Sequence, residues 1–219
     1  MKALLLEISF FESFFKVHYT KGFKLTYPIP LPTSVAGIFG AMFGIERERL
    51  KDEFKDFLFG AKLLKYESII PENITYLQYK SQGHKVEKGV IQSFIINEPT
   101  YLLSIAGEEN KIKEIEKLFK EIKYIPYGGQ NDFFVKDWKI SGFDNVKEDV
   151  EVTNYAPQDW VKNIIFERGF EVQILPVRHS LSKNPNFYFI INGKLVLKDK
   201  VFCTEKDSIG LYSLNYFNS

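Results

Sequence analysis

The segment from Tyr27 to Gly44 restricts the possible folds of this chain more than any other. It reads YPIPLPTSVAGIFGAMFG, in which three alternating prolines precede a run of small and apolar residues. Proline has no amide donor and biases the residue before it towards extended conformations. A helix is predicted to begin at Pro32-Thr33-Ser34, with Thr33 as its N-cap, and to run to about Gly44. Because this helix is apolar on nearly every side, we expect it to be buried on more than one side.

Other apolar runs place strands and a second helix around this segment. Residues 2–11 read as a buried strand, and residues 100–107 read as another. Residues 108–123 predict an amphipathic helix, with apolar residues recurring every three or four positions. The resulting order of strand, helix, strands, helix and strand predicts an α+β, ferredoxin-like (RRM-like) βαββαβ unit. A β-hairpin reaching out from the body is predicted as an insertion near residues 78–92.

The last third of the chain contains short β-like runs separated by turn residues. We therefore predict a ferredoxin-like domain over residues 1–145 and a mostly β extension over residues 146–219, packed on it. The dipeptide Asn192-Gly193 is a strong signal for a hairpin turn.

Composition excludes several classes of function. The 29 Lys and Arg residues balance 28 Asp and Glu residues, which argues against coating nucleic acid by bulk charge. Cys203 is the single cysteine, so neither an internal disulfide nor a multi-cysteine zinc site is possible. No apolar run approaches the roughly 18 residues of a membrane span. We expect a cytoplasmic protein with no membrane partner, no metal and no cofactor.

Two short blocks resemble those of a known protein family. The first is the proline-rich turn and Gly/Ala-rich helix that begin at Tyr27, following an apolar strand and an arm. The second is Pro126-Tyr127-Gly128-Gly129-Gln130-Asn131, placed after the second predicted helix. Together they resemble the CRISPR-associated Cas-five family of the RAMP superfamily, over about residues 1–140.

This resemblance implies a subunit of a type I Cascade surveillance complex, of an archaeal type such as I-A or I-B. The implied partners are the 5′ handle of crRNA, the Cas-seven backbone subunits, the large subunit and target DNA within the complex. The implied role is to hold the handle without catalysis and to cap the filament of backbone subunits.

The residues themselves suggest how such RNA would be bound. Cations and rings alternate in the arm, as recognition of single-stranded RNA requires, although an ordinary solvated loop has the same composition. The first amides of a helix suit a phosphate, although Thr33 and Ser34 equally suit a simple helix cap. Gly128 and Gly129 allow positive φ and close approach of the backbone to a ligand, and the amides beside them can read base edges, although Gly-Gly turns are common. The predicted RNA-binding residues are Lys16, His18, Tyr19, Lys21, Lys24, Tyr27, Thr33, Ser34, Gly128, Gly129, Gln130, Asn131 and Arg178.

The hairpin tip is predicted to contact a neighbouring subunit through Gln82, His84, Lys85 and Lys88. Contact with a kinked nucleotide and a mobile, merely soluble loop are the alternatives. For Arg178, a surface ion pair is the alternative to RNA contact.

Catalysis is one alternative function, and a protein-interaction module whose rings all belong to the core and which does not bind RNA is another. One branch of the Cas-five family, in type I-C systems, cuts pre-crRNA without a metal, and such chemistry needs a base, an acid and a cation. The chain has only His18, His84 and His179 as histidines, and none is part of a Lys-His pair like that of the catalytic branch. A site of His18, Lys24 and Tyr27 is conceivable, but their spacing does not require it. We therefore expect no catalytic residues.

Overall fold

The computed structural model describes residues 1–18, 20, 22–79 and 86–217, and the predicted α+β class is confirmed. The helical segments are α1 (Pro32–Phe43), α2 (Leu50–Glu53), α3 (Glu109–Leu118) and the 3-10 turns η1 (Arg47–Arg49), η2 (Gln158–Trp160) and η3 (Leu214–Tyr216). The strands are β1 (Lys2–Phe10), β2 (Glu12–Ser13), β3 (Phe23–Lys24), β4 (Leu58–Lys65), β5 (Ser68–Tyr79), β6 (Val86–Asn97), β7 (Thr100–Gly107), β8 (Val135–Val152), β9 (Tyr155–Pro157), β10 (Val161–Pro176), β11 (Asn186–Thr204) and β12 (Tyr212–Ser213).

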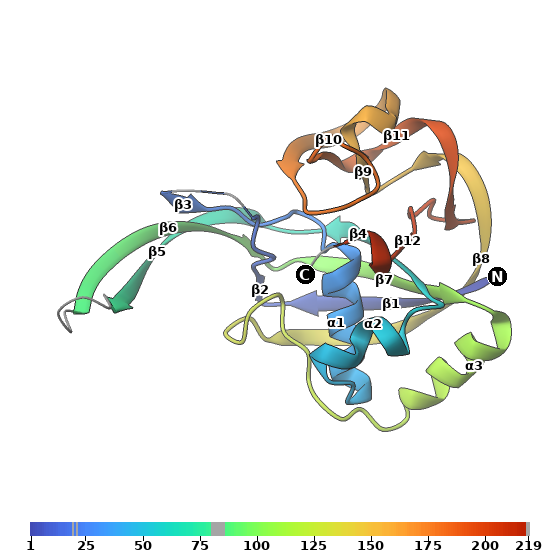
Figure 1. The fold of residues 1–219 in the computed structure, drawn as a ribbon, viewed down its shortest axis with the longest axis horizontal. Coiled ribbons are helices and arrows are strands. Elements are labelled where there is room, and N and C mark those ends of the chain that lie inside the picture. The colour runs from blue at the N-terminus through green and yellow to red at the C-terminus, as the bar shows by residue number, and fades with distance from the viewer. Residues whose placement is uncertain (19, 21, 80–85, 218–219) are drawn as a thin grey trace.

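A large sheet organises the described part of the chain, with strands in the order β10-β11-β8-β1-β7-β4-β12 and β9 beside β11. The central pairs β8–β1, β1–β7 and β7–β4 are antiparallel. The helices lie on one side of this central region, and the C-terminal strands β9, β10 and β11 lie at the opposite end of the molecule (Figure 1). Along the chain, the elements of the central region follow as β1, α1, β4, β7, α3 and β8.

Helix α1 is the centre of the main hydrophobic core. Val35, Phe39 and Met42 are fully buried, and their neighbours in the core come from β1, β4, β7 and the C-terminal segment. At Gly40 the side chain of Leu50 lies so close that an added Cβ would be 2.3 Å from its Cδ2. The glycine therefore lets α2 pack directly on the backbone of α1, which explains its place in an otherwise good helix.

The ends of both long helices differ from the prediction. The N-cap of α1 is Leu31, which has no side-chain capping bond, so the prediction of Thr33 as N-cap is wrong. Pro32 occupies the first turn instead, where its missing amide costs nothing. The C-cap is Gly44 in the left-handed conformation with φ 73°, close to the predicted end. Helix α3 ends at Leu118, earlier than predicted, and its last residues continue as turns.

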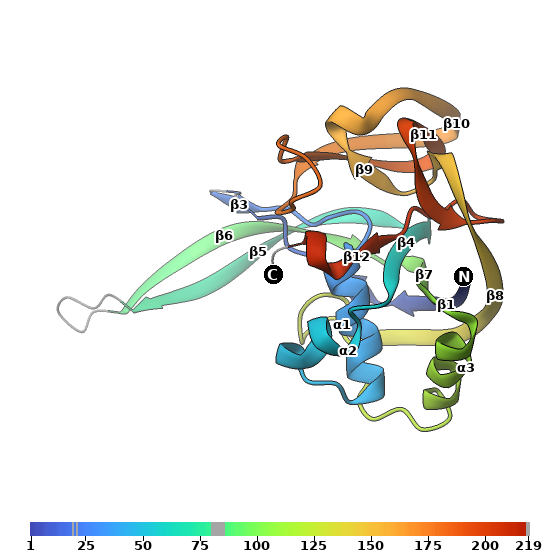
Figure 2. The same cartoon turned by 45° about the vertical axis from the view of Figure 1, so that its right-hand side comes forward.

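The predicted hairpin is present but begins well before residue 78. Strands β5 and β6 pair from Ser68 opposite Asn97 to Tyr79 opposite Val86, and they project from the body (Figure 2). Near the body β6 also pairs with β2 and β3. In the described part of the ribbon, beyond these contacts, β5 and β6 pair only with each other.

The C-terminal region joins the body through the sheet itself. Strand β8 passes through residue 145 without a break, pairing with β1 before that point and with β11 after it. The division into two domains at residue 145 stays a prediction. Asn192-Gly193 is not a hairpin turn, because β11 continues through it, with Asn192 at φ 52°. The dipeptide instead lies opposite a bulge of β10 between Phe166 and Glu171, where the Asn192 side chain bonds to Gly169 O.

Candidate nucleic-acid interface

The arm that follows β1 and the glycine turn lie against each other, although more than 100 residues separate them in sequence. The Phe14 amide donates to Gly128 O at 2.7 Å, and the Gly128 amide donates to Phe133 O at 2.8 Å. The arm folds back on itself, because the Val17 amide donates to Leu25 O and the Tyr27 amide donates to Phe15 O. The fold thus brings the predicted residues Lys16 and Gly129 into one region.

The two glycines serve the packing of the chain on itself. An added Cβ on Gly128 would lie 2.8 Å from Glu12 O, and one on Gly129 would lie 2.1 Å from Phe14 O. Gly129 also has φ +102°, a conformation that other residues rarely adopt. A ligand was predicted to approach the backbone of this turn closely, whereas in the structure the arm of the chain itself makes the close approach. Gln130 and Asn131, in the same turn, are exposed.

Cations from both ends of the sequence gather at the arm. Lys16 is exposed on the arm, and Arg178 is exposed in the loop after β10. The pKa of His18 is lowered, first by burial and then by the nearby charges of Arg178 and Lys16. Positive charges grouped in this way also attract anions, so the grouping is compatible with phosphate binding.

Lys24 connects this cluster to the base of the hairpin. It lies opposite Ser93 where β3 pairs with β6, and it is partly buried. The adjacent Phe23 ring is 43% exposed and packs edge-on against Phe94, with centroids 6.3 Å apart. Phe23 was missed in the sequence, although its position beside Lys24 in a ring-and-cation segment was a usable signal. Tyr19 and Lys21 lie outside the described residues.

Tyr27 lies in the core, which corrects the prediction that it contacts RNA. Its side chain is 2% exposed, its ring stacks on Phe189 at 5.4 Å, and its hydroxyl donates to Pro176 O at 2.6 Å. It fastens the N-terminal arm to the C-terminal strands. A ring enclosed in this way presents no face to a base.

The start of α1 is less available for a phosphate than predicted. The amides of Ser34 and Val35 both donate to Leu31 O, at 2.9 and 3.0 Å. Thr33 and Ser34 are partly buried. Amides that were expected to hold a phosphate are therefore already used within the first turn.

Exposed rings beside the glycine turn form a second feature that the sequence did not reveal. Phe11, Tyr127 and Phe134 are 52%, 42% and 57% exposed. The Tyr127 and Phe134 rings are 5.8 Å apart, and the Phe11 amide donates to Phe134 O. Lys136 Nζ lies 5.7 Å above the Phe11 ring while it also pairs with Glu98. Distant strands assemble this group, so local sequence carried no signal for it.

His179 has a structural role. Its Nε2 donates to Asn184 O at 2.9 Å, its Nδ1 accepts from the Leu181 amide at 3.1 Å, and its ring packs edge-on against Phe187. This pattern requires a neutral ring. It organises the loop that carries Arg178.

Stability should therefore decrease as the pH falls through the range in which histidine titrates. The pKa of His179 is lowered, mainly by burial, and burial also lowers that of His18, so the unfolded state binds protons more readily than the folded state. The two neutral histidines contribute fully to the free energy of unfolding above the unfolded pKa of about 6.5, and this contribution is lost as the pH falls below that value. Urea unfolding at pH 7.5 and pH 5.5 should show this loss, and H179N should reduce the difference. An unchanged difference in H179N would contradict the role given to this ring.

The hairpin residues predicted to contact a partner are only partly visible. Gln82, His84 and Lys85 lie outside the described residues, whereas Lys88 is exposed on β6 opposite Leu77. Apolar side chains on the same ribbon are exposed as well: Tyr76, Leu77, Val86 and Val90.

Comparison with solved structures identifies the fold of this chain. No protein-family model and no curated protein sequence matches the chain. Among solved structures, a chain of a CRISPR RNA-guided surveillance complex matches with a TM-score of 0.54 at 13% identity, covering 90% of this chain and 91% of that one. A CRISPR protein from Archaeoglobus fulgidus matches with a TM-score of 0.50 at 15% identity, covering 97% and 99%. This chain has the fold of CRISPR-associated proteins.

The resemblance expected from the Tyr27 block and the glycine turn is thus confirmed at the level of the fold. Both matches cover nearly the whole of each chain, so the C-terminal strands share in the likeness as well as the first 140 residues. None of the helices in the described residues is long and apolar enough to span a membrane.

Proposed function

We propose that this chain is a non-catalytic, crRNA-binding subunit of a CRISPR surveillance complex of the Cascade type. The observation that carries the proposal is the gathering of Lys16, His18 and Arg178 where the arm, the base of the hairpin and the loop after β10 meet. Such a cluster suits the phosphates of a single strand, and the exposed Phe23 ring beside it suits a base. The fold that this chain shares with CRISPR-associated proteins agrees with this role.

The surface of the central sheet favours the arm over the sheet as the RNA site. In RRM domains, aromatic residues on the sheet stack the bases. On the face away from the helices, β1 carries Leu5, Glu7 and Ser9, and β7 carries Thr100, Leu102 and Ser104. Most of these residues are buried, and Leu5 and Leu102 pack against Ile209 of the C-terminal segment. Glu7 on this face pairs with Lys139. On these two strands the face is therefore largely covered, and the residues named carry no ring on which a base could stack.

The proposal also includes the ferredoxin-like assignment of the fold. The chain order β1-α1-β4-β7-α3-β8 and the antiparallel neighbours β8-β1-β7-β4 support a ferredoxin-like βαββαβ unit with an inserted hairpin. We infer a type I complex of the archaeal kind, with the 5′ handle of crRNA as ligand. The projecting hairpin, with its exposed apolar residues, would contact a Cas-seven backbone subunit, and the large subunit and target DNA would be further partners.

Cleavage of pre-crRNA is the alternative, and the geometry gives it little support. The conceivable set of His18, Lys24 and Tyr27 is not assembled at one surface, because Tyr27 is buried with its hydroxyl bonded to Pro176 O. His179 is bonded through both ring nitrogens. A scaffold binds repeat RNA and leaves it intact, whereas a nuclease cuts it at one phosphodiester.

The test is binding of repeat RNA by the purified protein in EDTA, followed by native and denaturing gels at several salt concentrations. For K16A/R178A we expect weaker binding and a log–log salt slope shallower by about 1.4, since each phosphate contact to a single strand contributes about 0.7. The matched control is K113A/R49A, which removes the same charges from ion-paired positions on the helices. An equal loss in both variants would contradict the assigned site. A discrete product that disappears in H18A would replace the scaffold with a ribonuclease.

A further inference from the structure

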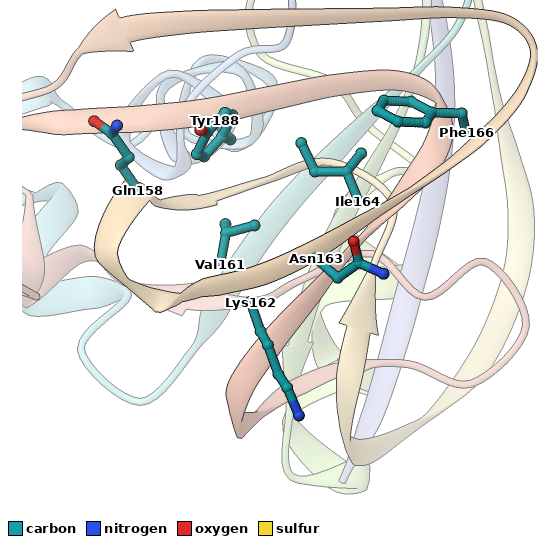
Figure 3. Close-up of a pocket in the computed structure, with 7 residues that line it drawn as sticks. All are labelled: Gln158, Val161, Lys162, Asn163, Ile164, Phe166 and Tyr188. Carbon is teal, nitrogen blue, oxygen red and sulfur yellow. The ribbon is translucent and has the colours of Figure 1, made fainter.

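A second candidate site lies in the C-terminal strands, at the start of β10. A pocket of about 400 Å³ is formed there by Val161, Ile164 and Phe166 of β10 together with Tyr188 of β11 and Gln158 of η2. These side chains lie on one side of β10, while Lys162 extends to the other side (Figure 3). The pocket shares no residue with the Lys16, His18 and Arg178 cluster.

A bulge in β10 places two rings at the edge of this pocket. Phe166 pairs with Gly193 and Glu171 with Ile191, so the intervening residues 167–170 project from the ladder. Gly169 has φ +74°, and the Asn192 side chain donates to Gly169 O at 3.0 Å, which holds the bulge in place. The Phe166 and Phe170 rings are 4.3 Å apart and are 56% and 47% exposed. Bulges often redirect side chains in this way beside functional sites.

Polar groups complete the site. Gln158 Oε1 accepts from Asn184 Nδ2 at 3.3 Å, so the Gln158 amide nitrogen remains as a donor towards the pocket. Asn163, which also lines the pocket, is exposed. Such amides can bond to the edges of a base whose face lies on a ring.

The local charge suits a phosphate chain. Lys162 and Arg168 are exposed and form no ion pair within the residues that the structure describes. Lys198 Nζ donates to the backbone oxygen of Asp159. The carboxylates of Asp159, Glu167, Glu171 and Asp199 are near in sequence, so the site depends on its two unpaired cations and not on a net positive charge.

We propose that this pocket binds an unstacked base of a single-stranded nucleic acid, at a site separate from the one at the arm. The base would stack on Phe166 or on Tyr188, which lie towards opposite ends of the pocket (Figure 3), with the nearer of the Asn163 and Gln158 amides at its edge. Because β10 is the outermost strand of the sheet, Lys162 on its other side can meet the phosphates of the same strand. RNA and DNA share this chemistry, and a protein ligand is less suited, because unpaired cations and amides surround the rings.

The test is photo-crosslinking of short unstructured oligonucleotides carrying 5-iodouracil, one of RNA and one of DNA, with the crosslinked peptides identified by mass spectrometry. The K16A/R178A protein is used so that the first site does not dominate. We expect crosslinks at Phe166 or Tyr188, and about a tenfold loss of affinity in F166A/F170A, as stacking measurements on other proteins suggest. Whichever oligonucleotide crosslinks more strongly identifies the natural strand.

The control is F143A/F202A, which removes two other rings that are each 41% exposed. All variants should stay folded and lose similar, small amounts of thermal stability, because each deleted ring is at least 41% exposed. Crosslinks confined to other peptides, or an equal loss in F143A/F202A, would overturn the proposal. So would crosslinking of this surface to a protein subunit in the assembled complex. The pocket could crosslink as expected while K16A/R178A binds repeat RNA normally. That result would contradict the RNA site proposed at the arm and would support the second site.

Discussion

Replacing Tyr27 by alanine is expected to destabilise the protein by about 3–5 kcal/mol, the usual cost of deleting a buried aromatic ring. The ring stacks on Phe189 and its hydroxyl bonds to Pro176 O, so the variant loses the contact between the arm and the C-terminal strands. For a chain of this size the melting temperature should fall by roughly 6–20 °C. Thermal unfolding followed by circular dichroism measures the effect.

Tyr27→Phe separates the structural role from contact with RNA. It keeps a ring that could stack on a base, but it leaves Pro176 O without the hydroxyl, at a cost of about 1–3 kcal/mol. We expect lower stability with unchanged RNA affinity. Full stability in Y27F, together with normal melting but weak RNA binding in Y27A, would mean that Tyr27 contacts RNA.

The second large effect is expected for Gly129→Ala. A Cβ at this position would lie 2.1 Å from Phe14 O and would also impose strain at φ +102°. Because the obstructing atom belongs to the backbone, no side-chain movement relieves the clash. We expect destabilisation of at least about 2 kcal/mol, measured by urea unfolding, and loss of the contact between the glycine turn and the arm.

Two further glycines serve as controls for this variant. Gly142 has φ +125° but nothing within 4 Å of an added Cβ, so G142A measures the strain without the clash. Gly37 lies in α1 with nothing within 4 Å, so G37A should be neutral or stabilise the helix by up to about 1 kcal/mol. If G129A is no worse than G142A, close packing of the arm is not what the glycine provides.

The candidate site illustrates what a sequence reveals and what it hides. Lys16, His18 and Lys24 were recognisable because cations and rings alternate within one segment, and that segment does lie at the surface. Tyr27 belongs to the same segment and fits the same chemistry, yet it faces inward, because Phe189 and Pro176 arrive from the C-terminal strands to cover it. Similarly, nothing near Phe11 in the sequence indicates Tyr127 or Phe134.

The sequence by itself determined the local structure of this protein and the order of its elements. Proline spacing and apolar periodicity placed α1 and α3, and continuous apolar runs placed β1 and β7, because such signals act within a few residues. Tertiary structure decided that Asn192-Gly193 continues a strand, that the glycine turn packs on the arm, and that Arg178 joins Lys16 and His18. Those outcomes depend on contacts between segments far apart in the chain, whose free energy of packing outweighs local preference.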